Sequence, residues 1–231
     1  MDMLKDGNGY FIAIPTNMPV GTEIEYRECY NSSQIMNLEK QSNDPTVTVD
    51  KPIIYLYPTE DMELSVKLGY EDKITCSYPQ YITGWNILAE TSSNLIDLKT
   101  NRNLYALYYE SEAVYDFEIQ EDGFIVKGTD ITNFLEEKLA ILGFTEREME
   151  EFIIYWAPKL QENEYNYIRF ATIEEINKNM PLEFSTQPDT LIRVLMTYKG
   201  LDTPIDVKEQ QLETPERTGF VAVEWGGTEI K

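Results

Sequence analysis

The chain has 231 residues, 42% of them hydrophobic, which is enough to bury a core as one large domain or two small ones. It carries 19 basic and 41 acidic residues and no histidine, so its formal net charge is −22 at pH 7. This charge opposes binding to nucleic acid or to an anionic membrane. The absence of histidine excludes Ser-His-Asp and Cys-His catalysis and imidazole-ligated metals.

Residues 1–50 are expected to form a short β-rich extension followed by a polar linker. Residues 10–14 are apolar and precede a turn, whereas residues 37–50 are polar and contain Asn43-Asp44-Pro45. No run in the chain approaches the ~18–20 apolar residues of a membrane span, and the N-terminus lacks a basic region followed by an apolar block. The chain as given is therefore expected to be soluble, without a membrane span.

The two cysteines, Cys29 and Cys76, match no zinc or redox spacing. Alternation over residues 74–78 predicts that Cys76 lies on an apolar face as a buried, inert thiol. The alternative is a Cys29–Cys76 disulfide, which would imply an oxidising compartment.

Residues 51–58 combine two prolines with an apolar strand pattern. The period of two places Ile53, Tyr55 and Tyr57 on one face and Ile54 and Leu56 on the other, so neither face is polar. Such a strand is either sandwiched between layers or displays its tyrosines to a ligand. The first interpretation is favoured, with the prolines preventing the strand from extending at either end.

From residue 51 to about residue 127 the pattern is that of successive short strands separated by turn residues, which favours antiparallel pairing. The predicted strands after the first are residues 64–68, 74–78, 85–89, 104–109, 115–119 and 124–126.

A helical period follows. Apolar positions predict one helix at about 130–142, ended by Gly143, and a second at about 145–160. Thr145 and Glu148 form the sequence pattern of a capping box, and Pro158 predicts a kink or an end near residues 155–157.

The strand pattern returns in residues 167–170, 182–185, 191–198 and 220–224. Two helices inserted between two sets of strands predict an α+β fold, mainly an antiparallel sandwich-like or barrel-like sheet. The predicted organisation is an extension over 1–50 and one domain over 51–231.

Two end motifs carry a resemblance to a known family. Lys51-Pro52-Ile53-Ile54-Tyr55-Leu56-Tyr57-Pro58 and Gly219-Phe220-Val221-Ala222-Val223-Glu224-Trp225-Gly226-Gly227 are similar to the KPVIYLYP-like opening and FxVVEWGG-like close of a family of uncharacterised bacterial proteins. The resemblance covers residues 51–231 and implies no particular reaction. The chain has Leu107-Tyr108-Tyr109-Glu110 where that family more often resembles LFWEG.

Aromatic side chains are abundant, with 16 Tyr, 9 Phe and 3 Trp. Aromatic faces stack on sugar rings or peptide groups, and neighbouring carboxylates accept their hydrogen bonds. The candidate ligand contacts are Trp225, Tyr108, Tyr109, Trp85, Tyr55, Tyr57 and Arg193. The alternative is that the tyrosines simply cover strand faces.

Carboxylates supply the candidate catalytic groups, because glycosidases use two carboxyl groups at ~5 to ~9.5 Å. Glu110 and Glu112 occupy positions i and i+2 of one strand and project from the same face, although a solvated surface is the favoured interpretation for both. Glu224 lies between the apolar Val223 and Trp225 and is expected to be buried and to need a partner. Arg193 is the predicted partner, in a buried ion pair.

No contiguous metal-binding loop and no cofactor motif is present. Calcium is the one cation that suits an acidic chain without histidine or spaced cysteines, but the sequence does not supply its ligand loop. We therefore expect neither metal nor cofactor.

Three functions remain open. The favoured one is a secreted or envelope-associated binding or structural module for a neutral glycan or a protein, without catalysis. The first alternative is a carboxylate-dependent hydrolase of glycans or peptides, with Glu224 as the acid and Glu110 or Glu112 as its partner. The second is an acidic intracellular regulator that occupies a basic partner surface.

Overall fold

The computed structural model describes residues 2–5, 11–14, 46–114 and 117–230. The chain divides into two compact units at Pro45–Thr46. In the first unit, β1 (Asp2–Lys5) and β2 (Phe11–Ile14) pair antiparallel. Cys29 and most of the predicted N-terminal extension lie outside the described residues.

The second unit contains all the helices and the remaining strands of the described chain. Its first half comprises β3 (Thr46–Tyr57), β4 (Met62–Leu68), η1 (Glu71–Lys73), β5 (Ile74–Tyr78), β6 (Trp85–Ala89), β7 (Leu95–Asp97), β8 (Arg102–Leu104), β9 (Leu107–Val114) and β10 (Asp122–Lys127). Its second half comprises η2 (Gly128–Asp130), α2 (Ile131–Ile141), α3 (Glu146–Leu160), β11 (Tyr165–Phe170), α4 (Ile173–Asn179), β12 (Leu182–Phe184), β13 (Thr190–Leu201), β14 (Lys208–Glu209) and β15 (Val221–Glu229).

The strands form two separate sheets rather than a closed barrel. One is eight-stranded, in the order β14-β10-β11-β13-β15-β3-β9-β5, and the other is five-stranded, in the order β12-β4-β6-β7-β8. Most neighbours are antiparallel, but β13 and β15 at the centre of the larger sheet are parallel, as are β10 and β14 at one edge. The predicted α+β fold with an inserted pair of helices is confirmed.

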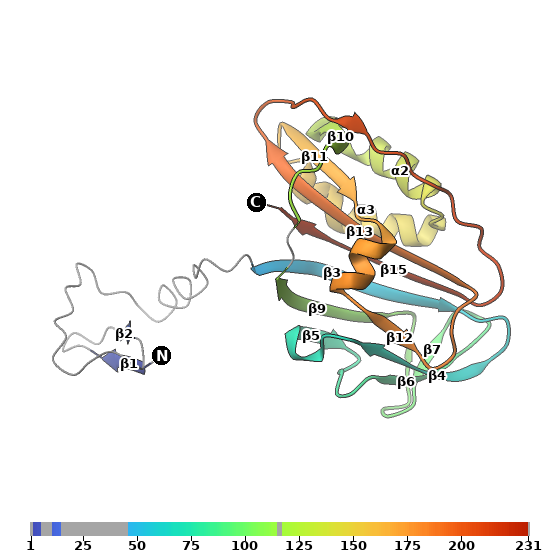
Figure 1. Cartoon of the computed structure of the whole chain (residues 1–231). Helices are drawn as coiled ribbons and strands as arrows, with labels where there is room; N and C mark the ends of the chain where they lie inside the picture. Colours follow the sequence, from blue (N-terminus) through green and yellow to red (C-terminus); the bar gives the residue numbers. More distant parts are fainter. Residues whose placement is uncertain (1, 6–10, 15–45, 115–116, 231) are drawn as a thin grey trace. The chain divides into compact units, whose positions relative to one another are not determined.

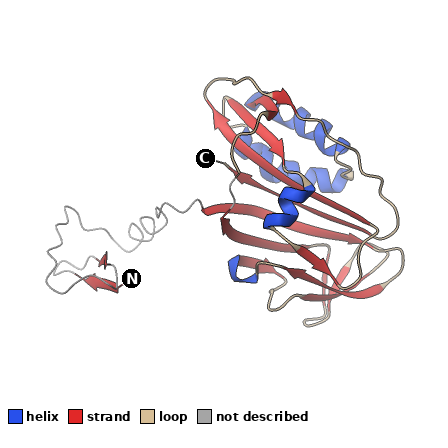
Figure 2. Cartoon of the chain, viewed as in Figure 1, coloured by secondary structure: helices blue, strands red, loops and turns tan. Residues whose placement is uncertain are grey.

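Layers cover both faces of the larger sheet (Figures 1 and 2). Helices α2 and α3 pack on one face, and the five-stranded sheet lies on the other. Helix α4 packs on the second face as well, through the buried Ile176. The core therefore consists of two apolar layers separated by the central strands.

Strand β3 belongs to both core layers. Ile53 and Tyr55 pack in the layer that contains the helices, whereas Ile54 and Leu56 pack in the layer that contains the second sheet. The central strands β13 and β15 alternate in the same way. The sandwiched interpretation of this two-faced pattern is thus confirmed, since a strand buried on both faces has no polar side.

Helix α3 begins and ends where the sequence predicts, although it contains a proline. The Thr145 hydroxyl accepts a hydrogen bond from the Glu148 backbone amide, and the Glu148 carboxylate accepts one from the Thr145 amide at 2.7 Å, which completes the capping box. The helix then continues through Pro158 to Leu160, in agreement with the predicted range of about 145–160, so it does not end at residues 155–157. Proline leaves the carbonyl four residues earlier without an intrahelical donor, and here that residue is Ile154, which is 66% exposed, so water can satisfy the carbonyl.

We expect Thr145→Ala to lower the free energy of unfolding by about 1 kcal/mol, because the Glu148 amide loses its acceptor. Chemical denaturation monitored by circular dichroism measures this change. Glu150→Ala on the exposed side of the same helix is the control, and an equal loss in both variants would contradict a role for the cap.

The predicted burial of Cys76 is wrong, because its side chain is exposed. The pairing of β5 with β9 shifts register between Ile74 and Cys76. Such an irregularity reverses the alternation, so Ile74 packs against the core while Cys76 faces outward. The register shift was not visible in the apolar pattern of residues 74–78.

Among the described residues, no helix combines the length and apolarity that a membrane crossing would require.

Candidate functional site

Glu224 and Arg193 lie opposite each other on the parallel strands β15 and β13. Arg193 Nε donates to Glu224 Oε2 at 2.6 Å, and the Tyr109 hydroxyl of β9 donates to Glu224 Oε1 at 2.7 Å. The Arg193 and Glu224 side chains are 0% and 5% exposed. The predicted buried ion pair is therefore confirmed, and Tyr109 is its third member.

The hydrogen bonds of this group extend in two directions between the sheets. The hydroxyls of Tyr109 and Tyr70 lie 2.7 Å apart, and Arg193 Nη1 donates to Asn177 Oδ1 of α4 at 2.7 Å. Arg193 Nη2 is buried and has no hydrogen-bond partner among the described residues. The network thus links β9, β13 and β15 to α4.

Burial and charge fix the protonation states of Tyr109 and Arg193. Burial, reinforced by the adjacent Glu224 carboxylate, raises the pKa of the Tyr109 hydroxyl well above its usual value. Burial lowers the pKa of the Arg193 guanidinium, but the Glu224 carboxylate outweighs it and leaves that pKa raised. Tyr109 therefore remains a hydrogen-bond donor and Arg193 remains a cation throughout the neutral range.

The location of Glu224 bears on the hydrolase alternative. A general acid must reach its substrate, but Glu224 lines none of the three described cavities, and both of its oxygens accept hydrogen bonds from protein groups. Arg193, the candidate ligand contact, is held in the same network. The arrangement therefore fixes the packing of three strands rather than exposing a carboxyl group.

Trp225 and Trp85 are also enclosed. Trp225 packs edge-to-face on Phe152 of α3, with ring centres 5.2 Å apart, and donates its indole N–H to the Tyr55 hydroxyl at 3.3 Å. Trp85 Nε1 donates to the Pro79 carbonyl at 2.7 Å in the other core layer. Neither indole is exposed, so both of these predicted ligand contacts pack against other residues inside the protein.

Tyr57 belongs to a charged cluster at the start of α3. The Arg217 guanidinium lies 5.0 Å from the Tyr57 ring centre and forms two hydrogen bonds, of 2.9 and 3.2 Å, to the fully buried Glu148 carboxylate. This cluster ties the segment before β15 to the helix. Sequence reasoning assigned Glu148 to the capping box but missed Arg217, since nothing local connects residues so far apart.

Tyr108, Glu110 and Glu112 lie on the outward face of β9, opposite the direction of the buried Tyr109. Tyr108 and Glu110 are half-buried, Glu112 is exposed, and the Tyr108 hydroxyl donates to the Glu110 carboxylate. Register pairing places Tyr78 of β5 directly beside Tyr108, and Tyr78 is 53% exposed. The predicted common face of Glu110 and Glu112 is confirmed, and the exposed Tyr78 adds to it.

The described part of the chain contains no group of three or more Cys, Asp or Glu residues arranged to hold a metal ion.

Comparisons with models of protein families, with curated proteins and with solved structures found no match. The resemblance of the two end motifs to a bacterial family therefore stays a prediction. The structure adds one fact about these motifs, which is that they form adjacent strands: β15 pairs antiparallel with β3, with Glu224 opposite Ile54 and Trp225 opposite Ile53.

Proposed function

We propose that this protein is a non-catalytic binding module for a neutral glycan, which it contacts through the outward face of β5 and β9. The observation that carries the proposal is the pair formed by Tyr78 and Tyr108, which are cross-strand neighbours on an outward face. Aromatic side chains at directly paired strand positions offer a platform on which sugar rings stack. The expectation of a secreted or envelope-associated location stays a prediction.

The polar groups beside the two rings support the same ligand class. Glu110 and Glu112 follow Tyr108 along the strand and present carboxylates that accept hydrogen bonds from sugar hydroxyls. Burial, together with the hydrogen bond to Glu110, raises the pKa of Tyr108, so its hydroxyl keeps its proton at neutral pH. A neutral ligand is favoured over an anionic one because the chain has a net charge of −22.

The hydrolase alternative has less support. Glu224 is tied to Arg193 and Tyr109 inside the protein, and Glu112 is an exposed carboxylate that lines none of the three described cavities. Catalytic carboxyl pairs need environments that separate their protonation states, which enclosure usually provides. The outward face of β9 therefore suits binding better than bond cleavage.

The test is an array of neutral oligosaccharides, followed by titration calorimetry with the best ligand. We expect Tyr78→Ala and Tyr108→Ala each to weaken binding about tenfold, because each removes one stacking surface. Glu110→Gln should weaken binding less, since an amide oxygen still accepts hydrogen bonds.

Leu98→Ala and Glu118→Gln, which change exposed residues away from this face, are the matched controls. Equal affinity of the tyrosine variants and the controls would refute the proposed face. Release of a reducing sugar during incubation would instead favour the hydrolase.

A further inference from the structure

The largest of the three described cavities lies on a different part of the molecule from Tyr78 and Tyr108. It is a groove of about 750 Å³ bounded by β10, helix α2 and residues 204–207 of the loop after β13. Phe124, Val126 and Phe134 contribute apolar surface, and Ile205 and Val207 contribute more from the loop. Its volume is within the usual range of ligand sites, ~300–1,000 Å³.

One wall of this groove is an open strand edge. Strand β14 covers the edge of β10 only at Asp122 and Gly123. There the carbonyls of Glu121 and Gly123 accept hydrogen bonds from the amides of Lys208 and Gln210, at 2.9 and 3.2 Å.

The backbone N–H and C=O groups of residues two positions apart along a strand point to the same edge. The N–H and C=O groups of Ile125 and Lys127 therefore point to the same edge as the Gly123 carbonyl. No described strand pairs with β10 on that side beyond Gly123. The short β14 shows that this edge accepts a strand, and the groove leaves room for a longer one.

The charged residues that line the groove favour a cationic ligand. Lys138 is already neutralised, because its ammonium group lies 2.9 Å from a Glu137 oxygen and 3.6 Å from a Glu209 oxygen. Lys127 is the other basic residue of the lining, whereas Asp130 and Asp206 add two more carboxylates, so acidic groups exceed basic ones.

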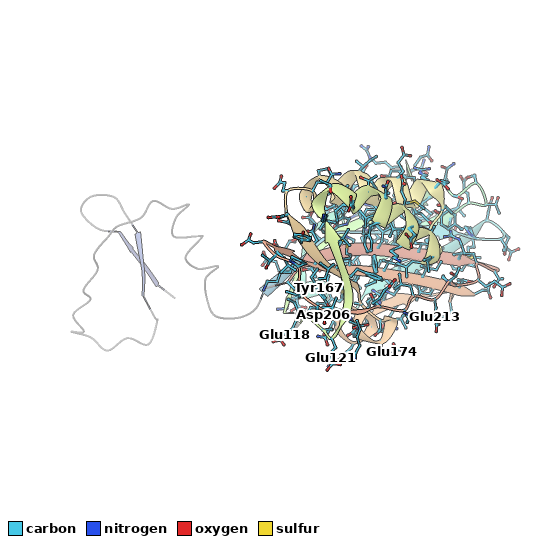
Figure 3. The ribbon with its side chains drawn as sticks, turned by 90° about the horizontal axis from the view of Figure 1, so that it is seen from above. Glu118, Glu121, Tyr167, Glu174, Asp206 and Glu213 are labelled. Carbon is cyan, nitrogen blue, oxygen red and sulfur yellow. The ribbon has the colours of Figure 1, made fainter. Side chains whose placement is uncertain are left out.

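The surroundings of the groove carry charges of both signs. Figure 3 labels Asp206 of the groove together with Glu118, Glu121, Tyr167, Glu174 and Glu213. Basic groups lie among these carboxylates, since Lys208 Nζ is 3.4 Å from Glu121 and Arg169 pairs with Asp122 and Glu175. The net charge of −22 nevertheless favours a basic partner over an acidic one.

We propose that this groove binds an extended peptide segment of a partner protein that carries a lysine or arginine. The peptide adds a strand to the free edge of β10 and forms backbone hydrogen bonds with Ile125 and Lys127. Its cationic side chain lies near Asp206. Main-chain hydrogen bonds supply affinity in this mode of recognition, and side-chain contacts supply specificity.

The test uses eight-residue peptides that alternate valine and threonine and carry one lysine, with glutamate counterparts. Fluorescence anisotropy measures the dissociation constants, and backbone amide shifts in NMR spectra of the full chain locate the site. We expect the lysine peptides to shift the amides of Ile125 and Lys127, and the glutamate peptides to bind about threefold to tenfold more weakly. Methylation of the peptide amides that face β10 should weaken binding at least about tenfold.

Two charge reversals in the same loop separate a local contact from long-range attraction. Asp206→Lys should weaken binding of the lysine peptide about threefold to tenfold. Asp202→Lys, at an exposed position outside the groove, should change the affinity for this peptide little. The proposal is overturned if no peptide shifts the β10 amides, if N-methylation has no effect, or if the two variants weaken binding equally.

Discussion

Glu224→Gln is expected to lower the free energy of unfolding by about 3–5 kcal/mol, because it leaves the Arg193 cation buried without its counter-charge. The Tyr109 hydroxyl can still donate to the new amide oxygen, so the loss reports mainly on the ion pair. Urea denaturation at neutral pH, followed by tryptophan fluorescence, measures the change.

Two further variants control this experiment. Arg193→Met combined with Glu224→Gln removes both charges and should cost less than the sum of the two single changes, since no unpaired ion remains. Lys73→Met breaks an exposed pair with Asp72 and should change stability little. A loss of less than about 1 kcal/mol in Glu224→Gln would show that the pair does not stabilise the native packing.

The second large effect is expected at Gly227. A Cβ atom at this position would lie 2.5 Å from Cζ2 of Trp156, whose ring is fully buried between α3 and the sheet. An indole in a packed core has no free space into which it can move. Gly227→Ala should therefore lower the free energy of unfolding by about 1–3 kcal/mol, through overpacking.

The adjacent Gly226 is the matched control. A Cβ atom there would approach Pro52 to 3.4 Å, an ordinary van der Waals contact, so Gly226→Ala should be tolerated. Thermal unfolding of the two variants side by side compares them. An equal fall in melting temperature would mean that the glycines act through backbone conformation rather than through the space that Trp156 occupies.

The two end motifs of the sequence meet at this point of the core. Strand β3 carries the first motif and β15 the second, and α3 packs on their common face through Phe152 and Trp156. The glycine at position 227 is explained by this packing, because a residue without a Cβ atom leaves room for the ring of Trp156, which is far away in the sequence. The paired motifs are therefore explained first by packing, and the proposed glycan face lies on the neighbouring strands β5 and β9.

Local patterns determined much of the fold. The helical spacing and the Thr145 capping box predicted the start of α3, because both depend on residues within one or two turns. The two apolar faces of residues 53–57 predicted a sandwiched strand, since burial on both sides leaves no position for a polar residue. A buried Glu224 needs a cationic partner, and this need predicted Arg193, the arginine within the otherwise apolar run of residues 191–196.

Only the tertiary structure decided which candidate residues face solvent and which sheet edge is open. Tyr108 and Tyr109 are neighbours in the sequence, yet one lies on an outward face and the other inside the ionic network. The register shift in β5 exposes Cys76, and the short β14 leaves most of the β10 edge free. These features depend on pairings between distant segments, so the local alternation of residues does not encode them.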